Sequence, residues 1–293
     1  MPNGIIVIDK PADWTSMDVC AKLRRLLGER RVGHAGTLDP MATGVLPVFV
    51  GRATRGVEFA EGGDKTYIAG LRLGLETDTQ DSTGTVLRAH EVNCAREDLE
   101  NILPRFRGEL LQVPPMYSAL KRNGKKLYEL ARQGRTVERK PRPITISRLE
   151  ILSREGEEHY TLRISSSKGT YVRTLCHDIG QALGCGGVMD ALRRTRAAGF
   201  TLEQAVTLER VIQASEEGAA ESLLMPVDRL FAAHPPLTVR GRTERLCRNG
   251  NPFRQEGEDG LYRVYGADGT FLMLGRLEQG TMKTVKSFFS VPK

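Results

Sequence analysis

Residues 33–51, GHAGTLDPMATGVLPVFVG, decide how this chain is organised, because a glycine-bracketed loop runs directly into a short apolar strand. Gly36 and Gly44 can adopt backbone angles that are closed to other residues, and Pro40 fixes its own φ. The loop can therefore hold one carboxylate, Asp39, in a rigid pose. A carboxylate held in this way can act as a nucleophile, as a general base or as an anchor for a cation. The alternative is an ordinary Asp-Pro turn, which the spacing alone favours.

The length and composition indicate a globular protein with one large core and a smaller module. The chain has 293 residues, of which 40% are apolar and 27% are charged. No stretch approaches the roughly 20 apolar residues of a membrane helix, and the first residues lack the basic and apolar regions of a signal peptide. We therefore expect a cytoplasmic protein without a membrane partner.

The cysteines and histidines do not form a recognisable metal or disulfide pattern. The chain has 5 Cys and 5 His, with no Cys-x-x-Cys pair and no His-x-x-x-His pair. We expect neither a disulfide framework nor a metal site. His34, beside the glycine-bracketed loop, is by itself more typical of a structural hydrogen-bonding group than of a catalytic one.

The positive charge is concentrated in one short segment. The net charge of the chain is +7, and residues 121–142, KRNGKKLYELARQGRTVERKPR, have nine Lys or Arg and two Glu, which is also +7. Such a segment is typical of an arm that binds phosphates, because each neutralised phosphate releases counterions. Tyr117 and Tyr128 add surfaces on which bases can stack. The alternative is a solvated basic helix with a narrow apolar stripe at Leu127 and Leu130.

The apolar pattern predicts an α+β fold, with a mixed, largely antiparallel sheet and flanking helices. Strands are predicted at residues 5–8, 67–73 and 160–164, the last two with alternating apolar positions. A helix capped by Ser16 is predicted to end at Gly28.

A second helix is predicted after residues 167–170, SKGT, and Arg173 lies near its start, off its apolar stripe. The planar guanidinium can pair with a loop carboxylate, and the alternative is an ordinary surface arginine. After about residue 232, short apolar runs alternate with Gly, Asn and Asp turns, which predicts a small all-β module.

Six segments together resemble the TruB family of bacterial tRNA pseudouridine synthases. The resemblance covers nearly the whole chain, and six segments in order are highly specific. The segments are GIIVIDKPADWTS (4–16), RVGHAGTLDPMATGVLPVFVG (31–51), DKTYIAGLRLGLETDTQDSTG (64–84), VPPMYSALKRNGKKLYELARQG (113–134), SKGTYVRTLCHDIGQALG (167–184) and LRRTRAAGF (192–200). The family isomerises the uridine of the T-arm loop of tRNA, position 55, to pseudouridine.

The resemblance implies a role for each matching residue. Asp39 matches the essential aspartate, Tyr67 the active-site tyrosine and Arg173 the arginine that pairs with the aspartate. Leu192 matches a leucine that lines the uracil pocket, and His34 a histidine that supports the RNA around the extruded base. The lysines expected to bind the substrate are Lys65, Lys121, Lys125, Lys126 and Lys168.

The resemblance also implies an organisation and a reaction. Residues 1–231 are expected to form the catalytic domain, with the RNA-gripping insertion at about 121–142, and residues 232–293 a PUA-like RNA-binding domain. The isomerisation needs no net redox change, so no cofactor is expected, and a monomer without a protein partner is the default. Asp13 stands where the family's Lys-Pro-x-Gly turn has glycine, and Thr37 where some relatives have alanine.

Three alternatives stay open. The chain could bind or fold tRNA without catalysing a reaction. Asp39 could be the nucleophile of a glycosidase, which calls for a second carboxyl group about 5 Å away. The chain could also be a guide-RNA-dependent relative, although the insertion at 121–142 favours the stand-alone form.

Overall fold

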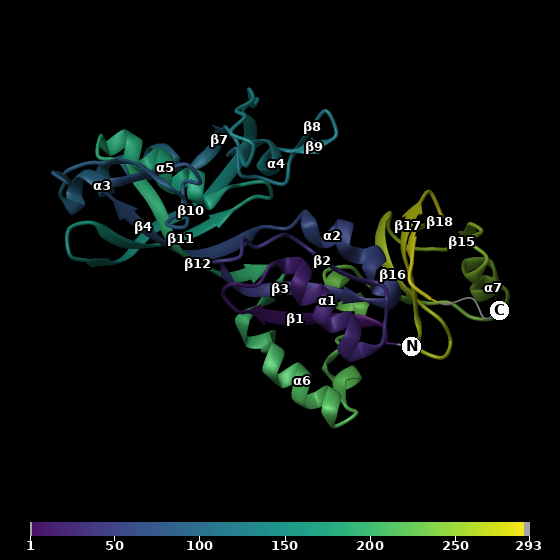
Figure 1. Ribbon diagram of the computed structural model, residues 1–293. Helices are drawn as coiled ribbons and strands as arrows, with labels where there is room; N and C mark the ends of the chain where they lie inside the picture. The colour runs from purple at the N-terminus through teal and green to yellow at the C-terminus, as the bar shows by residue number, and fades with distance from the viewer. Residues whose placement is uncertain (1, 290–293) are drawn as a thin grey trace.

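The computed structural model describes residues 2–289, and its centre is a nine-stranded mixed sheet (Figure 1). The strands follow the order β1-β3-β12-β4-β11-β10-β7, with β2 paired to β3 and β13 paired to β12. Their bounds are β1 Gly4–Lys10, β2 Val32–His34, β3 Thr43–Val50, β4 Lys65–Leu73, β7 Gly108–Gln112, β10 Arg142–Glu155, β11 His159–Ser166, β12 Gly187–Ala197 and β13 Phe200–Thr201. The predicted α+β fold with a largely antiparallel sheet is confirmed.

Strands β4 and β11 confirm the alternating pattern. Along β4 every second side chain is buried, from Lys65 to Leu73. In the antiparallel register Tyr67 lies opposite Ile164 and Leu71 opposite Tyr160. Side chains of one strand alternate between the two faces of a sheet, so the apolar positions of both strands share one core face.

The sheet has a parallel junction between β3 and β12. Arg193 lies opposite Thr43 and Arg194 opposite Gly44. Gly44 has φ +101, and any side chain there would collide with the backbone of Arg194. Glycine is thus required at the point where the loop with Asp39 enters the sheet.

The α-helices cover the sheet and the loops around it. Helix α1 (Ser16–Leu27) ends at Gly28 as predicted, but the residue that caps it is Thr15 and not Ser16. Thr15 and Asp18 form a capping box, which leaves the Ser16 hydroxyl free to bond elsewhere. The other helices are α2 Val57–Glu61, α3 Arg96–Ile102, α4 Leu127–Ala131, α5 Val172–Leu183, α6 Leu208–Glu216 and α7 Gly241–Arg248. Short 3₁₀ helices occupy Gly51–Gly56, Leu103–Phe106, Leu202–Gln204, Ala220–Leu223 and Val227–Phe231.

The basic segment 121–142 is mostly not a helix, so the helix of the alternative interpretation is wrong. It forms a hairpin of β8 (Lys121–Arg122) and β9 (Lys125–Lys126), followed by the five-residue α4, whose Leu127 and Leu130 are buried. Figure 1 shows it projecting beyond the end of the sheet. A further two-stranded sheet joins β5 (Leu75–Thr77) and β6 (Val86–Ala89).

The last part of the chain forms its own five-stranded sheet, in the order β14-β16-β17-β18-β15. It also has the helix α7, which the sequence pattern did not predict. Phe271 and Phe288 of this part pack on Phe231 and join the core cluster that contains Phe49. In Figure 1 the sheet lies beside α2. Its strands are β14 Pro236–Thr238, β15 Phe253–Arg254, β16 Gly260–Tyr265, β17 Phe271–Glu278 and β18 Thr281–Ser287.

Two further observations concern the described residues 2–289. No helix there is long and apolar enough to cross a membrane. All five cysteines are free thiols, and the sulfur atoms of Cys94 and Cys185 lie 3.8 Å apart.

Candidate active site

A cavity of about 890 Å³ lies between the loop that precedes β3 and the strands β4 and β12. Six of the residues expected at the site line it: Lys65, Tyr67, Asp39, Lys168, Arg173 and Leu192. These residues come from the loop after β2, from β4, from the loop and helix after β11, and from β12. His34, Lys125 and Lys126 do not line it, and Lys121 lines a second, smaller cavity.

The backbone on both sides of Asp39 is fixed by buried polar side chains. The Leu38 N–H donates to the Ser16 hydroxyl at 2.9 Å, and that hydroxyl donates to the Leu38 carbonyl at 3.2 Å. The Lys10 ammonium donates to the Pro40 carbonyl at 3.1 Å and to the Trp14 carbonyl at 2.6 Å. The loop is therefore held at the residues before and after Asp39, and the carboxylate points into a preformed site.

The turn that follows β1 has Asp13 where the family's turn has glycine. Asp13 has φ +64, in the left-handed region that glycine favours and aspartate tolerates. Its N–H donates to the Pro40 carbonyl at 2.9 Å. The departure at Asp13 therefore leaves the support of the Asp39 loop intact.

Arg173 connects three separate parts of the site. Its Nη2 lies 3.3 Å from Oδ2 of Asp39 and donates to the Tyr117 carbonyl at 2.8 Å. Its Nη1 lies 3.3 Å from Oδ2 of Asp81. Arg173 is 7% exposed, so the alternative of an ordinary surface arginine is wrong. One planar guanidinium holds the loop aspartate, a buried aspartate and the root of the basic segment.

Asp81 is a site residue that the sequence reasoning missed. It is 3% exposed, and it accepts hydrogen bonds from the Thr79 and Thr83 hydroxyls. The local pattern of residues 78–84, DTQDSTG, does not point to this role, because the partner of Asp81 lies on the distant helix α5. The signal that could have identified it is its place within the resembling segment 64–84.

The environment of Asp39 makes its carboxylate more basic. Burial raises the pKa of Asp39 above its ordinary value, the Arg173 charge lowers it, and the neighbouring Asp81 raises it. About a third of the side chain, 34%, stays exposed to the cavity. A carboxylate with a raised pKa is a better base and nucleophile, and Arg173 keeps it aligned.

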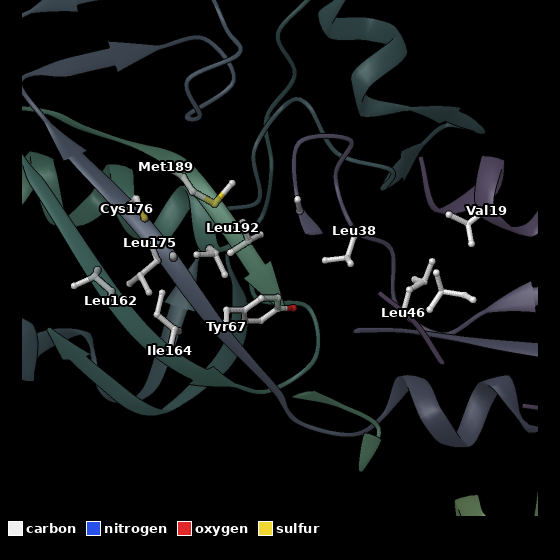
Figure 2. Packing of buried hydrophobic residues seen from close by; sticks show 14 of the residues in the cluster. Val19, Leu38, Leu46, Tyr67, Leu162, Ile164, Leu175, Cys176, Met189 and Leu192 are labelled. Atoms are coloured by element: carbon white, nitrogen blue, oxygen red, sulfur yellow. The ribbon is translucent and has the colours of Figure 1, made fainter. Parts of the chain in front are cut away.

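Tyr67 and Leu192 form the apolar side of the cavity. They are 7% and 9% exposed, and Figure 2 shows the Tyr67 ring beside Leu192 with its hydroxyl pointing towards Leu38. Burial raises the pKa of the Tyr67 phenol, the Arg194 charge lowers it, and Asp39 raises it. A flat ring and a branched aliphatic side chain suit the two faces of a planar base.

Lys65 and Lys168 have different environments at the cavity. Lys65 is 9% exposed and donates to the Gly63 carbonyl at 3.0 Å, while burial lowers its pKa. Lys168 is exposed. Lys65 thus fixes the backbone before β4, and Lys168 is free to contact a substrate at the mouth of the cavity.

His34 lies on the short strand β2, outside the cavity lining. Burial lowers its pKa, and the nearby Arg194 charge lowers it further, which favours the neutral ring. Its Nδ1 has no hydrogen-bond partner among the described residues.

The basic segment extends the site outward. Tyr117 and Tyr128 line the main cavity. The second cavity, of about 290 Å³, is lined by residues that include Lys121, Arg122, Arg139, Lys140 and Arg142. A pocket for a flat ring therefore continues into a strongly positive surface, which suits a polyanion.

Two other buried cations at the site carried no signal on their own. Lys10 and Arg194 are both 0% exposed. In the structure Lys10 follows Ile8 by two residues on β1 and Arg194 follows Leu192 by two residues on β12, so each shares a sheet face with a buried apolar residue. No cluster of three His, Cys, Asp or Glu that could hold a metal occurs among residues 2–289.

Comparison with known families matches most of the chain. The family described as TruB family pseudouridylate synthase (N terminal domain) matches residues 24–172. The family described as tRNA pseudouridylate synthase B C-terminal domain matches residues 173–232. The five-stranded C-terminal sheet lies beyond both matches.

Relatives and solved structures agree with these matches. The chain is 45% identical to tRNA pseudouridine synthase B of Azoarcus sp. (strain BH72), covering 96% of this chain and 93% of the relative. It is also 45% identical to tRNA pseudouridine synthase B of Stutzerimonas stutzeri (strain A1501), over 94% of this chain and 92% of that one. A crystal structure of a Cbf5-Nop10-Gar1 complex is similar with a TM-score of 0.72 and 25% identity, covering 98% of this chain and 85% of the other. The chain therefore belongs to the TruB family of pseudouridylate synthases, which are isomerases.

Proposed function

We propose that this enzyme converts the uridine at position 55, in the T-arm loop of tRNA, to pseudouridine without a cofactor. The observation that carries the proposal is the convergence of Asp39, Arg173, Tyr67 and Leu192 on one cavity of about 890 Å³. That volume lies in the range of small-molecule pockets and accommodates a nucleoside. The 45% identity to relatives named tRNA pseudouridine synthase B supports tRNA as the substrate.

The reaction moves one bond and one proton. The bond between N1 of uracil and C1′ of ribose breaks, the base turns, and a bond forms between C5 and C1′. C5 then loses its proton and N1 gains one, so atoms and electrons balance without an outside reagent. Asp39 can add to C6, attack C1′ or help to remove a ribose proton.

The target base has to leave its stack to enter the cavity, which costs a few kcal/mol. In our proposal Tyr67 packs on the uracil and takes the C5 proton late in the reaction, and Leu192 closes the pocket. Arg173 aligns Asp39. His34 and the exposed Lys168 support the RNA around the extruded nucleotide, His34 from outside the cavity lining.

The remaining parts of the chain bind the rest of the tRNA. Residues 121–142 grip the T arm through phosphates, with Lys121, Lys125 and Lys126 on the hairpin. Residues 1–231 form the catalytic domain, and residues 232–293 a PUA-like domain that contacts tRNA outside the modified loop. In our proposal the enzyme acts in the cytoplasm. It acts as a monomer, because one chain supplies every proposed residue of the site.

Two rival functions are less well supported. A protein that only binds or folds tRNA has no need of a rigidly held carboxylate with a raised pKa at the base of the cavity. A glycosidase needs a second carboxyl group that reaches the substrate. Asp81 is buried behind Arg173 and does not line the cavity. Glu61 does line it, but it is an exposed residue at the end of α2, and the strongly positive surface beside the cavity suits a polyanion better than a sugar.

The proposal is tested by incubating the purified enzyme and its Asp39→Asn variant with unmodified tRNA and with a T-arm stem-loop, without metal or nucleotide. Pseudouridine is then quantified and mapped. We expect it at the T-loop uridine with the wild type only. If both proteins bind tRNA and neither forms pseudouridine, the binding-protein function replaces this one.

A further inference from the structure

Arg194 has a guanidinium that is fully buried and lacks a carboxylate partner. It is 0% exposed, and its polar contacts are to backbone carbonyls, from Nε to Val45 at 2.7 Å and from Nη2 to Gly36 at 2.9 Å. Within residues 2–289 it forms no ion pair, and its Nη1 has no hydrogen-bond partner. Burying a charge without a counter-charge costs free energy. The buried guanidinium therefore calls for a negatively charged group beside it.

The neighbouring side chains identify what Arg194 faces. Arg194 and Tyr67 are directly opposite each other on the paired strands β12 and β4, and opposite residues project from the same face of a sheet. Lys10, Lys65 and His34 also lie close enough for the Arg194 charge to lower their pKa values. Tyr67 is the neighbour whose deprotonated form Arg194 favours.

The same guanidinium also holds the loop with Asp39. The carbonyls of Gly36 and Val45, which accept its hydrogen bonds, stand before and after Asp39 in the loop and in β3. A side chain at Gly36 would reach within 3.4 Å of Nη1 and 3.1 Å of Lys65, so glycine keeps this contact open. Arg194 therefore lies opposite the tyrosine and holds the frame of the aspartate loop through two carbonyls.

We propose that Arg194 is a positioning residue that stabilises the Tyr67 phenolate while it anchors the Asp39 loop. The proposal rests on the proposed role of Tyr67 as the base. Tyr67 releases its proton to solvent before the reaction, and the phenolate takes the C5 proton after the C5–C1′ bond has formed. The negative charge on the phenolate oxygen is then the missing counter-charge of the buried guanidinium.

The electrostatic balance at Tyr67 leaves its pKa above the ordinary value, so a phenolate there depends on a nearby positive charge. Burial raises its pKa, and Asp39, which faces it from the loop, raises it as well. Arg194, on the paired strand, opposes both effects. Without Arg194 the phenol would hold its proton more tightly, and base catalysis would weaken.

The test combines Arg194→Met and Arg194→Lys with a fluorinated tyrosine at position 67, whose phenol is more acidic. Single-turnover pseudouridine formation is measured on tRNA at saturating enzyme, together with tRNA affinity. We expect Arg194→Met to slow the reaction about 10–100-fold, part of the 10²–10⁴-fold that a general base contributes. In the Arg194→Met variant the fluorinated tyrosine should restore at least a third of the lost rate. In the protein with Arg194 it should change the rate by less than about twofold.

Arg193→Gln is the matched control. Arg193 lies next to Arg194 on β12 but pairs with Asp9 at 2.7 Å and is 43% exposed, so its substitution should leave the rate unchanged. A rate loss in Arg194→Met that the fluorinated tyrosine does not relieve would overturn the proposal, because a purely structural role is insensitive to phenol acidity. A wild type that forms no pseudouridine would instead contradict the proposed function.

A measurement without any Arg194 variant covers the case in which both variants unfold. The ¹⁵N resonances of the Arg194 side chain are compared in the wild type and in Tyr67→Phe. We expect their chemical shifts to differ between the two proteins. In the wild type we expect them to change with pH over the same range as the resonances of the Tyr67 ring. Resonances that stay the same would overturn the proposal.

Discussion

Nη2 of Arg173 lies 3.3 Å from Oδ2 of Asp39, although 134 positions separate the two residues in the chain. The contact joins the N-terminal turn of α5 to the loop between β2 and β3 across the cavity. It places a fixed positive charge beside the carboxylate that we propose carries the reaction. Arg173 also contacts Asp81 and the Tyr117 carbonyl.

Asp39→Asn should abolish catalysis and preserve binding. The amide has the shape of the carboxylate and lacks its charge, so nucleophilic and base catalysis are lost while the loop bonds of Leu38 and Pro40 remain. We expect a rate decrease of at least about 10³-fold, with tRNA affinity within about threefold of the wild type. Near-normal turnover by this variant would exclude the proposed role of the carboxylate.

Asp81→Asn should destabilise the fold and slow the reaction, because it removes one charge from a buried pair with Arg173. We expect the free energy of unfolding in urea to fall by about 3 kcal/mol. Glu100→Gln is the matched control, since its ion pair with Arg96 is exposed and should contribute less than about 0.5 kcal/mol. Equal losses in the two variants would show that Asp81 is not a structural partner of Arg173.

Lys10 should make stability depend on pH in the alkaline range. Burial lowers its pKa from 10.5 to about 8, so between these two values the unfolded chain binds more protons than the folded one. The stability of the wild type relative to Lys10→Met should therefore increase as the pH rises from about 8 to 10.5. Below about 8 both states are protonated, and the difference should be constant. A difference in unfolding free energy between the two proteins that stays constant throughout this pH range would contradict the prediction.

Neutralising Lys121, Lys125 and Lys126 to Gln should weaken tRNA binding and reduce its salt dependence. If all three contact phosphates, the slope of log affinity against log salt should decrease by about 2–3. Arg96→Gln combined with Arg148→Gln is the control, because both arginines form exposed ion pairs on other elements. A slope that matches the wild type would exclude the hairpin as the gripping surface.

The sequence by itself determined the local elements, because hydrophobic periodicity reports which face of a strand or helix is buried. It predicted the alternation from Tyr67 to Leu73 and the apolar stripe of α5, and both are confirmed. It also identified Asp39, Tyr67, Arg173 and Leu192 as candidates, but only through the resemblance of whole segments. Local spacing around Asp39 favoured an ordinary turn.

The tertiary structure decided which of these residues meet. The contact of Arg173 with Asp39 and Asp81, and the placement of Arg194 opposite Tyr67, depend on the pairing of β12 with both β3 and β4. Such pairings join segments more than a hundred residues apart, and periodicity within one segment contains no information about its partner. The same limit applies to Ser16. Its hydroxyl accepts a hydrogen bond from the Leu38 N–H and does not cap the helix, because folding brings the distant Leu38 backbone within reach.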